Sequence, residues 1–259
     1  VEIPLIVGGE EVRTGDTGQV VMPHAHGHVL GVYHKAGEAE VKRAVVAAKA
    51  AWQEWSRLDW AARAAIFLKA AEILTCRRRA GMNAVAMLDL SKTAHQSEID
   101  AIAEQADFWR FNPYYMMQIM QPQPGSIPSV WNMTEQRPLE GFVFAATPFN
   151  FASIAGNLPS APAMMGNTVI WKPASSAVYV AYQLMRVLEE AGLPLTFHLA
   201  PKLVAVAAGH GQHPTRRIGE LGERGGELQG AVGDPGRGDE VMKLIRTVIS
   251  FALGLVVGY

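Results

Sequence analysis

The stretch from residue 141 to residue 173 constrains the fold most, because it has the pattern of a strand, a helix and a second strand. Residues 142–146 and 168–171 are short apolar runs with aromatic or β-branched members, and an Ala-rich helical pattern over about 152–165 separates them. Such a strand–helix–strand unit joins parallel strands. The sequence therefore predicts an α/β fold with a parallel sheet.

Polar residues follow both expected strands at their carboxyl ends. Asn150 comes after the first strand, and Lys172 ends the second. Ligands of open α/β sheets bind in the crevice outside these ends. An Asn amide can donate to a developing oxyanion, and a Lys can donate to ribose or phosphate oxygens. The pattern alone also fits Asn150 as a helix cap and Lys172 as a solvated surface charge.

Both motifs at these ends are typical of one enzyme family. Pro148-Phe149-Asn150 and Trp171-Lys172-Pro173 resemble the motifs that end the first two nucleotide-binding strands of the aldehyde dehydrogenase superfamily. Over about residues 3–194 the chain resembles the 1-pyrroline-5-carboxylate dehydrogenase branch of proline catabolism. The segments that carry this narrower resemblance are 26–28, 63–71, 98–100, 107–112, 139–143 and 156–158.

The resemblance implies a fold and a reaction. The expected fold is aldehyde dehydrogenase-like α/β, with N-terminal helices and the first βαβ units of a Rossmann-like NAD-binding domain, truncated. The implied reaction is NAD-dependent oxidation of glutamate semialdehyde, the open form of pyrroline-5-carboxylate, to glutamate. The substrate is thus a small-molecule aldehyde, and the cofactor is NAD.

The resemblance also implies roles for single residues. Asn150 would supply the oxyanion-hole amide, and Lys172 would bind the adenosine ribose. Ser175 stands where the family often has an acidic residue, and its hydroxyl can still bind a ribose. Glu98 is expected on the helix that reaches the substrate entrance. The remaining residues expected to line the dinucleotide cleft are Thr147, Pro148 and Phe149.

The family's nucleophile and general base are not recognisable in this sequence. The reaction needs a cysteine thiolate to attack the aldehyde and a glutamate to activate water. The only cysteine is Cys76, which three arginines follow, and we expect a free structural cysteine there. We therefore expect the chain by itself to lack turnover by the family mechanism, and whether it is an enzyme stays open.

The resemblance ends near residue 194, which suggests two regions. Residues 1–194 would form the N-terminal and partial NAD-binding region, and 195–259 a divergent Gly/Arg-rich tail with an apolar C-terminus. Residues 209–238 have the composition of a loop or disordered segment. The uncharged run 247–259 is shorter than the roughly 20 residues of a spanning helix, so no membrane partner is expected. A frame shift, a mis-spliced product and a natural tail would each explain why the resemblance ends there.

Composition excludes other partners. The net charge of −1 gives no pull toward nucleic acid or anionic membranes. A single cysteine rules out an intrachain disulfide and suits a reducing interior. We expect an intracellular protein, in the mitochondrial matrix if eukaryotic and in the cytoplasm if bacterial. Because the chain begins with Val1, a leader removed by processing is also expected.

Periodicity predicts the N-terminal elements. Residues 3–7 and 19–21 are β-like, and helices are predicted over 38–55, about 60–74 and about 97–111. Residues 129–137 and 141–146 suggest a strand pair around Pro138. In the family a comparable hairpin joins a neighbouring subunit's sheet, so the resemblance implies a homo-oligomer formed through the 129–146 hairpin.

Two other functions are compatible with parts of the sequence. His24, His26 and His28 alternate, and His210 and His213 could add metal ligands. Because no acidic or cysteine ligand falls nearby, no metal site is assigned. The second alternative is a non-catalytic nucleotide-binding or subunit-interaction fragment.

Overall fold

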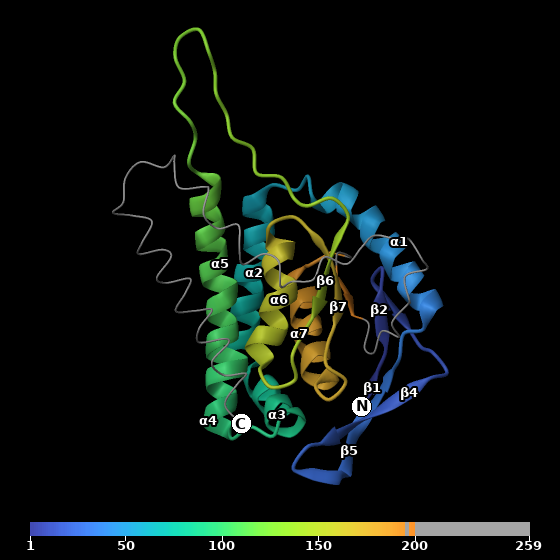
Figure 1. Ribbon diagram of the computed structural model, residues 1–259. Helices are drawn as coiled ribbons and strands as arrows, with labels where there is room; N and C mark the ends of the chain where they lie inside the picture. The colour runs from blue at the N-terminus through green and yellow to red at the C-terminus, as the bar shows by residue number, and fades with distance from the viewer. Residues whose placement is uncertain (195–196, 200–259) are drawn as a thin grey trace, which may run out of the picture. The chain divides into compact units, whose positions relative to one another are not determined.

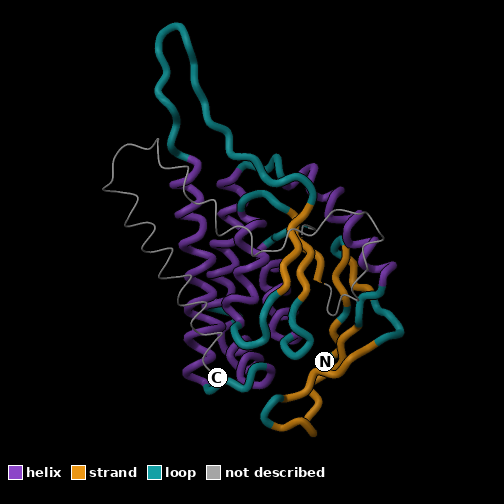
Figure 2. The backbone as a smooth tube through the Cα atoms, in the orientation of Figure 1, coloured by secondary structure: helices purple, strands orange, loops and turns teal. Residues whose placement is uncertain are grey.

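The computed structural model describes residues 1–194 and 197–199. All described elements belong to one unit, Val1–Val206 (Figures 1 and 2). Their order is β1 (Glu2–Ile3), β2 (Leu5–Val7), β3 (Glu10–Val12), β4 (Thr17–Met22), β5 (Ala25–His34), α1 (Glu38–Trp55), α2 (Trp60–Thr75), α3 (Arg79–Asp89), α4 (Ala94–Ser97), the π-helix η1 (Glu98–Glu104), α5 (Gln105–Met120), β6 (Phe142–Ala146), α6 (Ala152–Met164), β7 (Thr168–Lys172), α7 (Val178–Ala191) and β8 (Phe197–Leu199).

The predicted βαβ unit is present. Strands β6 and β7 pair in parallel with α6 between them in the chain, and β8 pairs in parallel with β7. The five-stranded sheet has the order β3-β2-β8-β7-β6, with β2 and β3 antiparallel at the other side. Because Ala146 lies opposite Lys172, the carboxyl ends of β6 and β7 are level with each other.

The two faces of β7 bury different side chains. Val169 and Trp171 belong to the large core that includes residues of α6 and α7, whereas Ile170 packs in the smaller core beneath α1. This alternation is the period of two of a β-strand, and the three central residues are all apolar because helices cover both faces. Figure 1 shows α1 on one side of the sheet and α6 and α7 on the other.

Of the three helices predicted in the N-terminal part, only the third differs clearly in length. The first two match closely, whereas the third runs from α4 through η1 to α5 and is much longer than 97–111. Side-chain caps start two of them: Asp59 accepts from the Ala61 amide, and Thr93 forms a capping box with Gln96. Helices α3 and α7 were not predicted, although both have an apolar face.

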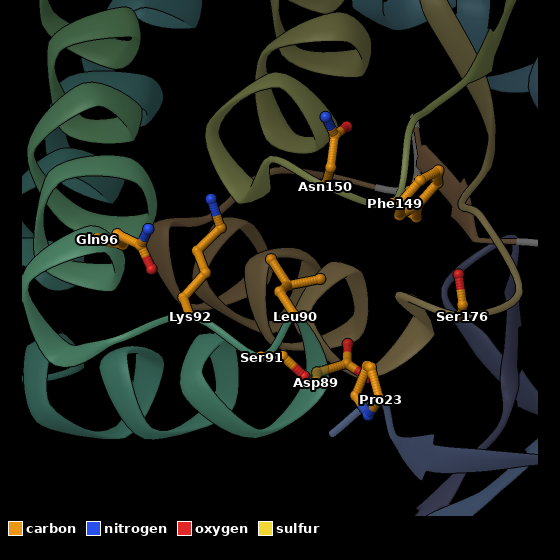
Figure 3. A pocket seen from close by; sticks show the side chains of 9 residues that line it. All are labelled: Pro23, Asp89, Leu90, Ser91, Lys92, Gln96, Phe149, Asn150 and Ser176. Carbon is orange, nitrogen blue, oxygen red and sulfur yellow. The ribbon is translucent and has the colours of Figure 1, made fainter. Parts of the chain in front are cut away.

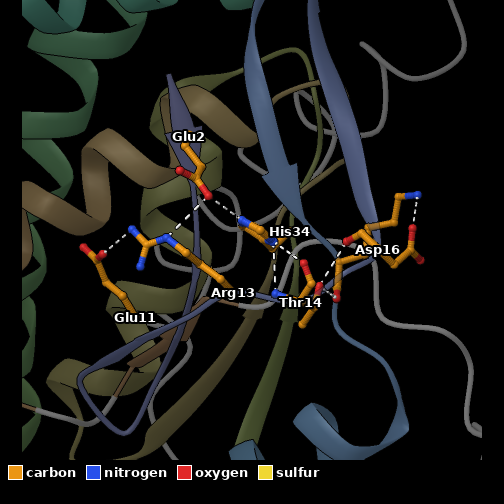
Figure 4. Close-up of polar contacts among 7 residues, drawn as sticks. Glu2, Glu11, Arg13, Thr14, Asp16 and His34 are labelled. Carbon is orange, nitrogen blue, oxygen red and sulfur yellow. Dashed lines mark hydrogen bonds and ion pairs between the residues drawn. The ribbon is translucent and has the colours of Figure 1, made fainter.

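The N-terminal β-segment 3–7 divides at Pro4 and joins two sheets. Strand β1 pairs with β5 in a three-stranded sheet, and β2 joins the five-stranded sheet. Buried His34 anchors this region: its Nε2 lies 2.9 Å from Glu2 Oε1, and its Nδ1 accepts from the Thr14 amide at 3.0 Å (Figure 4). The Thr14 contact joins the β3–β4 loop to the end of β5, and the Glu2 contact joins β1 to the same end.

The strand pair expected around Pro138 is not formed. Residues 129–137 belong to no strand, and β6 pairs with β7 instead. Residues 121–141 form a long projecting loop (Figure 2). Ile127 and Val130 exchange two backbone hydrogen bonds of 3.0 Å at its turn, and the Gln123 amide bonds both backbone groups of Thr134. We call residues 121–141 the arm; these backbone and side-chain hydrogen bonds connect its two limbs.

Candidate functional site

A cavity of about 470 Å³ lies beyond the carboxyl ends of β6 and β7. Asn150 and Phe149 enter it from the turn before α6, Ser176 from the turn after β7, and the α3–α4 connection supplies most of the rest (Figure 3). The complete lining is Pro23, Asp89, Leu90, Ser91, Lys92, Gln96, Phe149, Asn150 and Ser176. The cavity is at the position where open α/β sheets bind ligands.

The ends of β6 and β7 are held together by Thr147. Its amide donates to the Lys172 carbonyl at 3.1 Å, and its hydroxyl accepts from the Trp171 indole N–H at 2.9 Å. Both side chains are buried, so this polar pair is satisfied inside the core. The bond fixes where the chain leaves β6 and therefore where Pro148, Phe149 and Asn150 follow.

Lys172 ends β7 with a half-buried side chain. Among residues 1–194 and 197–199, its ammonium group has no ion-pair partner and donates no hydrogen bond. Lys172 is not part of the cavity lining, and Ser175 beside it is half-buried. Because no acceptor for this ammonium group lies within the described part of the chain, the group is available there to a polar ligand.

Asp89 is a buried carboxylate at the end of α3. Its Oδ2 accepts from the Val180 amide at 2.8 Å in the first turn of α7, and its Oδ1 has no hydrogen-bond partner among residues 1–194 and 197–199. Burial raises the pKa of Asp89 to about 7, although the backbone amides of Val180 and Tyr179 oppose the shift. The group caps α7, whose own N-cap residue is Ala177.

The structure brings together only some of the site residues expected from sequence. Phe149 and Asn150 are exposed in the cavity, Thr147 is buried against Trp171, and Pro148 is half-buried. Sequence reasoning missed Asp89, Lys92 and Gln96. Their only local signal is a cluster of polar residues after a helix, which is too common a pattern to single out a site.

Glu98 lies in η1 and faces α3. Its carboxylate accepts from Asn83 Nδ2 at 2.6 Å and pairs with Arg79. These hydrogen bonds, first that from Asn83, lower the pKa of Glu98. Glu98 is not among the residues that line the cavity.

The surroundings of Cys76 do not activate its thiol as a nucleophile. The exposed thiol donates to Glu72 Oε1 at 3.0 Å, and this bond raises the pKa of Cys76. A raised pKa lowers the fraction of thiolate, which is the nucleophilic form. Cys76 does not line the cavity.

The histidine alternative gains no support from the described part of the chain. There, no three His, Cys, Asp or Glu side chains are grouped so that they could hold a metal ion. His24 instead lies 2.8 Å from the Ser91 hydroxyl through its Nδ1. His210 and His213 lie outside the described residues.

Membrane association can be judged only for the described helices. None of them combines the length and apolar character that a membrane-spanning helix needs. The apolar run 247–259 and the Gly/Arg-rich stretch 209–238 lie outside the described residues.

The fold and the site define the class of protein. The model of the aldehyde dehydrogenase family matches residues 11–203, which is most of the chain, so the chain belongs to that family. Within it, the chain is 48% identical over 192 residues to the mitochondrial delta-1-pyrroline-5-carboxylate dehydrogenase of Homo sapiens, and 45% identical over 194 residues to the enzyme of Agaricus bisporus. Both the family and the branch expected from the motifs are confirmed.

These matches cover most of this chain but only part of each relative. The human match covers 74% of this chain and 34% of the human protein, and the Agaricus match 74% and 36%. The chain thus spans about a third of the length of these relatives.

A solved relative agrees in structure as well. The delta-pyrroline-5-carboxylate dehydrogenase from Mycobacterium tuberculosis bound with NAD superposes with a TM-score of 0.76 at 47% identity, covering 78% of this chain and 38% of that one. The aldehyde dehydrogenase-like α/β fold is therefore confirmed for the described part.

Proposed function

We propose that this chain binds NAD at the carboxyl ends of β6 and β7. Lys172 would donate to the adenosine ribose, with Ser175 as a second donor nearby. Thr147, Pro148 and Phe149 would form the adjoining wall. The half-buried Lys172 ammonium, which lacks an acceptor within the described residues, supports this assignment. An M. tuberculosis relative has been solved with NAD bound.

The proposed reaction of the enzyme to which these residues belong is oxidation of glutamate semialdehyde to glutamate. The observation that carries it is Asn150, which stands in the cavity just beyond β6, where an amide N–H can stabilise a developing oxyanion. NAD, when bound, accepts the hydride of this oxidation. Sequence similarity to relatives named for pyrroline-5-carboxylate supports the choice of substrate.

The same proposal leaves this chain without turnover of its own. The sequence offers no recognisable counterpart of the attacking thiolate, and the hydrogen bond to Glu72 raises the pKa of Cys76. We expect residues 1–194 to provide nucleotide contacts and the oxyanion amide only. The compartment proposed is the mitochondrial matrix for a eukaryotic source, as the names of eukaryotic relatives suggest, and the cytoplasm for a bacterial one.

The second candidate is a non-catalytic chain that binds other subunits through the arm. Trp131 is 80% exposed and Ile127 is 62% exposed at the end of the arm. Exposed apolar side chains on a projecting loop favour an interface, and a second copy of this chain is the partner we propose. A homo-oligomer and nucleotide binding are compatible with each other.

Calorimetric titration of NAD into the purified chain tests the main proposal. Lys172→Ala should weaken binding about tenfold, because a charged hydrogen bond to the ribose is lost. Asn150→Ala should leave binding unchanged, since the amide faces the reacting aldehyde in this proposal. Lys69→Ala, which removes an exposed lysine from α2, is the matched charge control.

Two results would overturn the assignment. One is the absence of any heat of binding from a cooperatively folded chain at millimolar NAD. The other is equal weakening by Lys172→Ala and Lys69→Ala, which would mean that only the overall charge matters.

A further inference from the structure

Helix α6 begins without a capping side chain of its own. Its N-cap residue is Phe151, which has no side-chain oxygen to accept from the first free amides of the helix. These amides are buried with Ala152 and Ser153, so they need another acceptor.

Asp100 supplies that acceptor from a distant element. Its Oδ2 accepts from the Ala152 amide at 2.9 Å, and its Oδ1 accepts from the Ser153 amide at 3.0 Å and from the Ser153 hydroxyl at 2.7 Å. Asp100 is 2% exposed and lies in the π-helix η1. Single π-helical turns occur frequently at functional sites, and this one directs a carboxylate at the start of α6.

Lys92 compensates the buried charge. Its Nζ lies 3.0 Å from Asp100 Oδ2 and 4.4 Å from the centroid of the Phe151 ring. The ammonium therefore touches both the cap and the residue that follows Asn150. In Figure 3, Lys92 extends from the α3–α4 connection toward Asn150 at the start of α6.

We propose that Asp100 is a positioning residue for Asn150. Asn150 is only two residues from the first amide that Asp100 holds, and its side chain lines the cavity. Asp100 holds the amides of Ala152 and Ser153 while Lys92 contacts Phe151, so the backbone directly after Asn150 is fixed and the side chain of Asn150 is directed into the cavity. The inference rests on the oxyanion role given to Asn150 under the proposed function.

The test compares Asp100→Ala and Asp100→Asn with Asp59→Ala in the full chain. Asp59 is the matched control, because it also caps a helix but starts α2. Two observables are recorded by NMR: hydrogen exchange of the Ala152 and Ser153 amides, and the side-chain amide signals of Asn150, which are identified by their loss in Asn150→Ala.

Asp100→Ala should speed exchange at both amides about tenfold, as loss of a cap does, and should also shift or broaden the Asn150 side-chain signals. Asp100→Asn keeps one carbonyl acceptor and should give a smaller change of the same kind. If Asp100→Ala does not fold, the result for Asp100→Asn tests the proposal. Asp59→Ala should change neither observable.

Faster exchange with unchanged Asn150 signals in both Asp100 variants would overturn the proposal, since Asp100 would then only cap α6. The NAD titration of Lys172→Ala is independent of this outcome. Failure of the nucleotide proposal and failure of the positioning proposal are therefore distinguishable.

Discussion

The residues around the cavity differ in whether their polar groups are already used in hydrogen bonds within the protein or are available to a ligand. Thr147 is 6% exposed and uses its amide and hydroxyl inside the protein, so its side chain supports the site from behind. Asn150 is exposed and, among the described residues, its side chain forms no hydrogen bond. Asp89 uses one carboxylate oxygen inside the protein, whereas its other oxygen is buried and has no partner within the described part of the chain.

Asp89 gives a pH-dependent prediction. Its pKa rises from 3.8 to about 7 in the folded protein, so folding favours the protonated form. The stability from this group is fully present below about pH 4 and is lost as the pH rises to about 7. The shift corresponds to about 4 kcal/mol at most. Asp89→Asn should remove this loss and raise the free energy of unfolding above pH 7.

Urea unfolding of the chain and of Asp89→Asn between pH 5 and pH 8 measures this difference. Asp107→Asn, at an exposed aspartate of α5, is the control and should follow the unmodified chain. Parallel pH profiles for Asp89→Asn and the unmodified chain would show that Asp89 is ionised throughout.

At the scale of elements, the pairing of α5 with α6 was not foreseeable from either helix alone. Polar contacts join them, including the 2.8 Å bond from Asn112 to Asn157 and the 3.0 Å bond from the Trp109 indole to Ser160. Gly156 is buried in α6 next to Gln105, the first residue of α5. An added Cβ there would lie 2.0 Å from Gln105 Oε1, so the glycine permits the close approach.

Gly156→Ala should therefore destabilise the chain by about 1–3 kcal/mol, because Gln105 is fully buried and the added carbon overpacks the interface. Thermal unfolding measures the effect. Gly81→Ala in α3 is the control: nothing lies within 4 Å of its added Cβ, and removal of a helical glycine should be neutral or stabilising by up to about 1 kcal/mol. Equal unfolding temperatures for both variants would contradict close packing at Gly156.

The sequence predicted the bounds of helices and strands best where the apolar residues follow one regular period. Strand β6 and helix α1 have the predicted bounds, since each shows a single clear period. The prediction of a strand over 129–137 was wrong, because a strand also needs a partner strand, which local composition does not reveal. Asn150 let the sequence predict where the cavity lies. Asp89 and Lys92, which also line it, were missed because they lie far from Asn150 in the chain.

At the scale of the whole molecule, the arm is the most exposed apolar feature among the described residues. Trp131, Met133 and Leu139 are each at least 61% exposed on it. An arm of this kind without a cover is costly in water, which is why we proposed a second copy of the chain as its partner.

Trp131→Ser should reduce self-association, because it removes the most exposed aromatic side chain of the arm. Sedimentation velocity over a concentration series measures the change as a lower average mass. Leu68→Ser, at a 46% exposed position of α2, should leave the mass unchanged. A monomeric unmodified chain at all concentrations would refute the interface.

The sequence by itself determined the βαβ unit, the polar residues at its strand ends and, through the motifs around Asn150 and Lys172, the family. These properties are local, because strand period, helix period and short motifs are written in neighbouring residues. The tertiary structure alone decided that Asp89 caps α7 and that Asp100 with Lys92 caps α6. The two carboxylate–amide contacts join residues 52 and 91 positions apart, and only packing of the helices brings a buried amide and a distant carboxylate together.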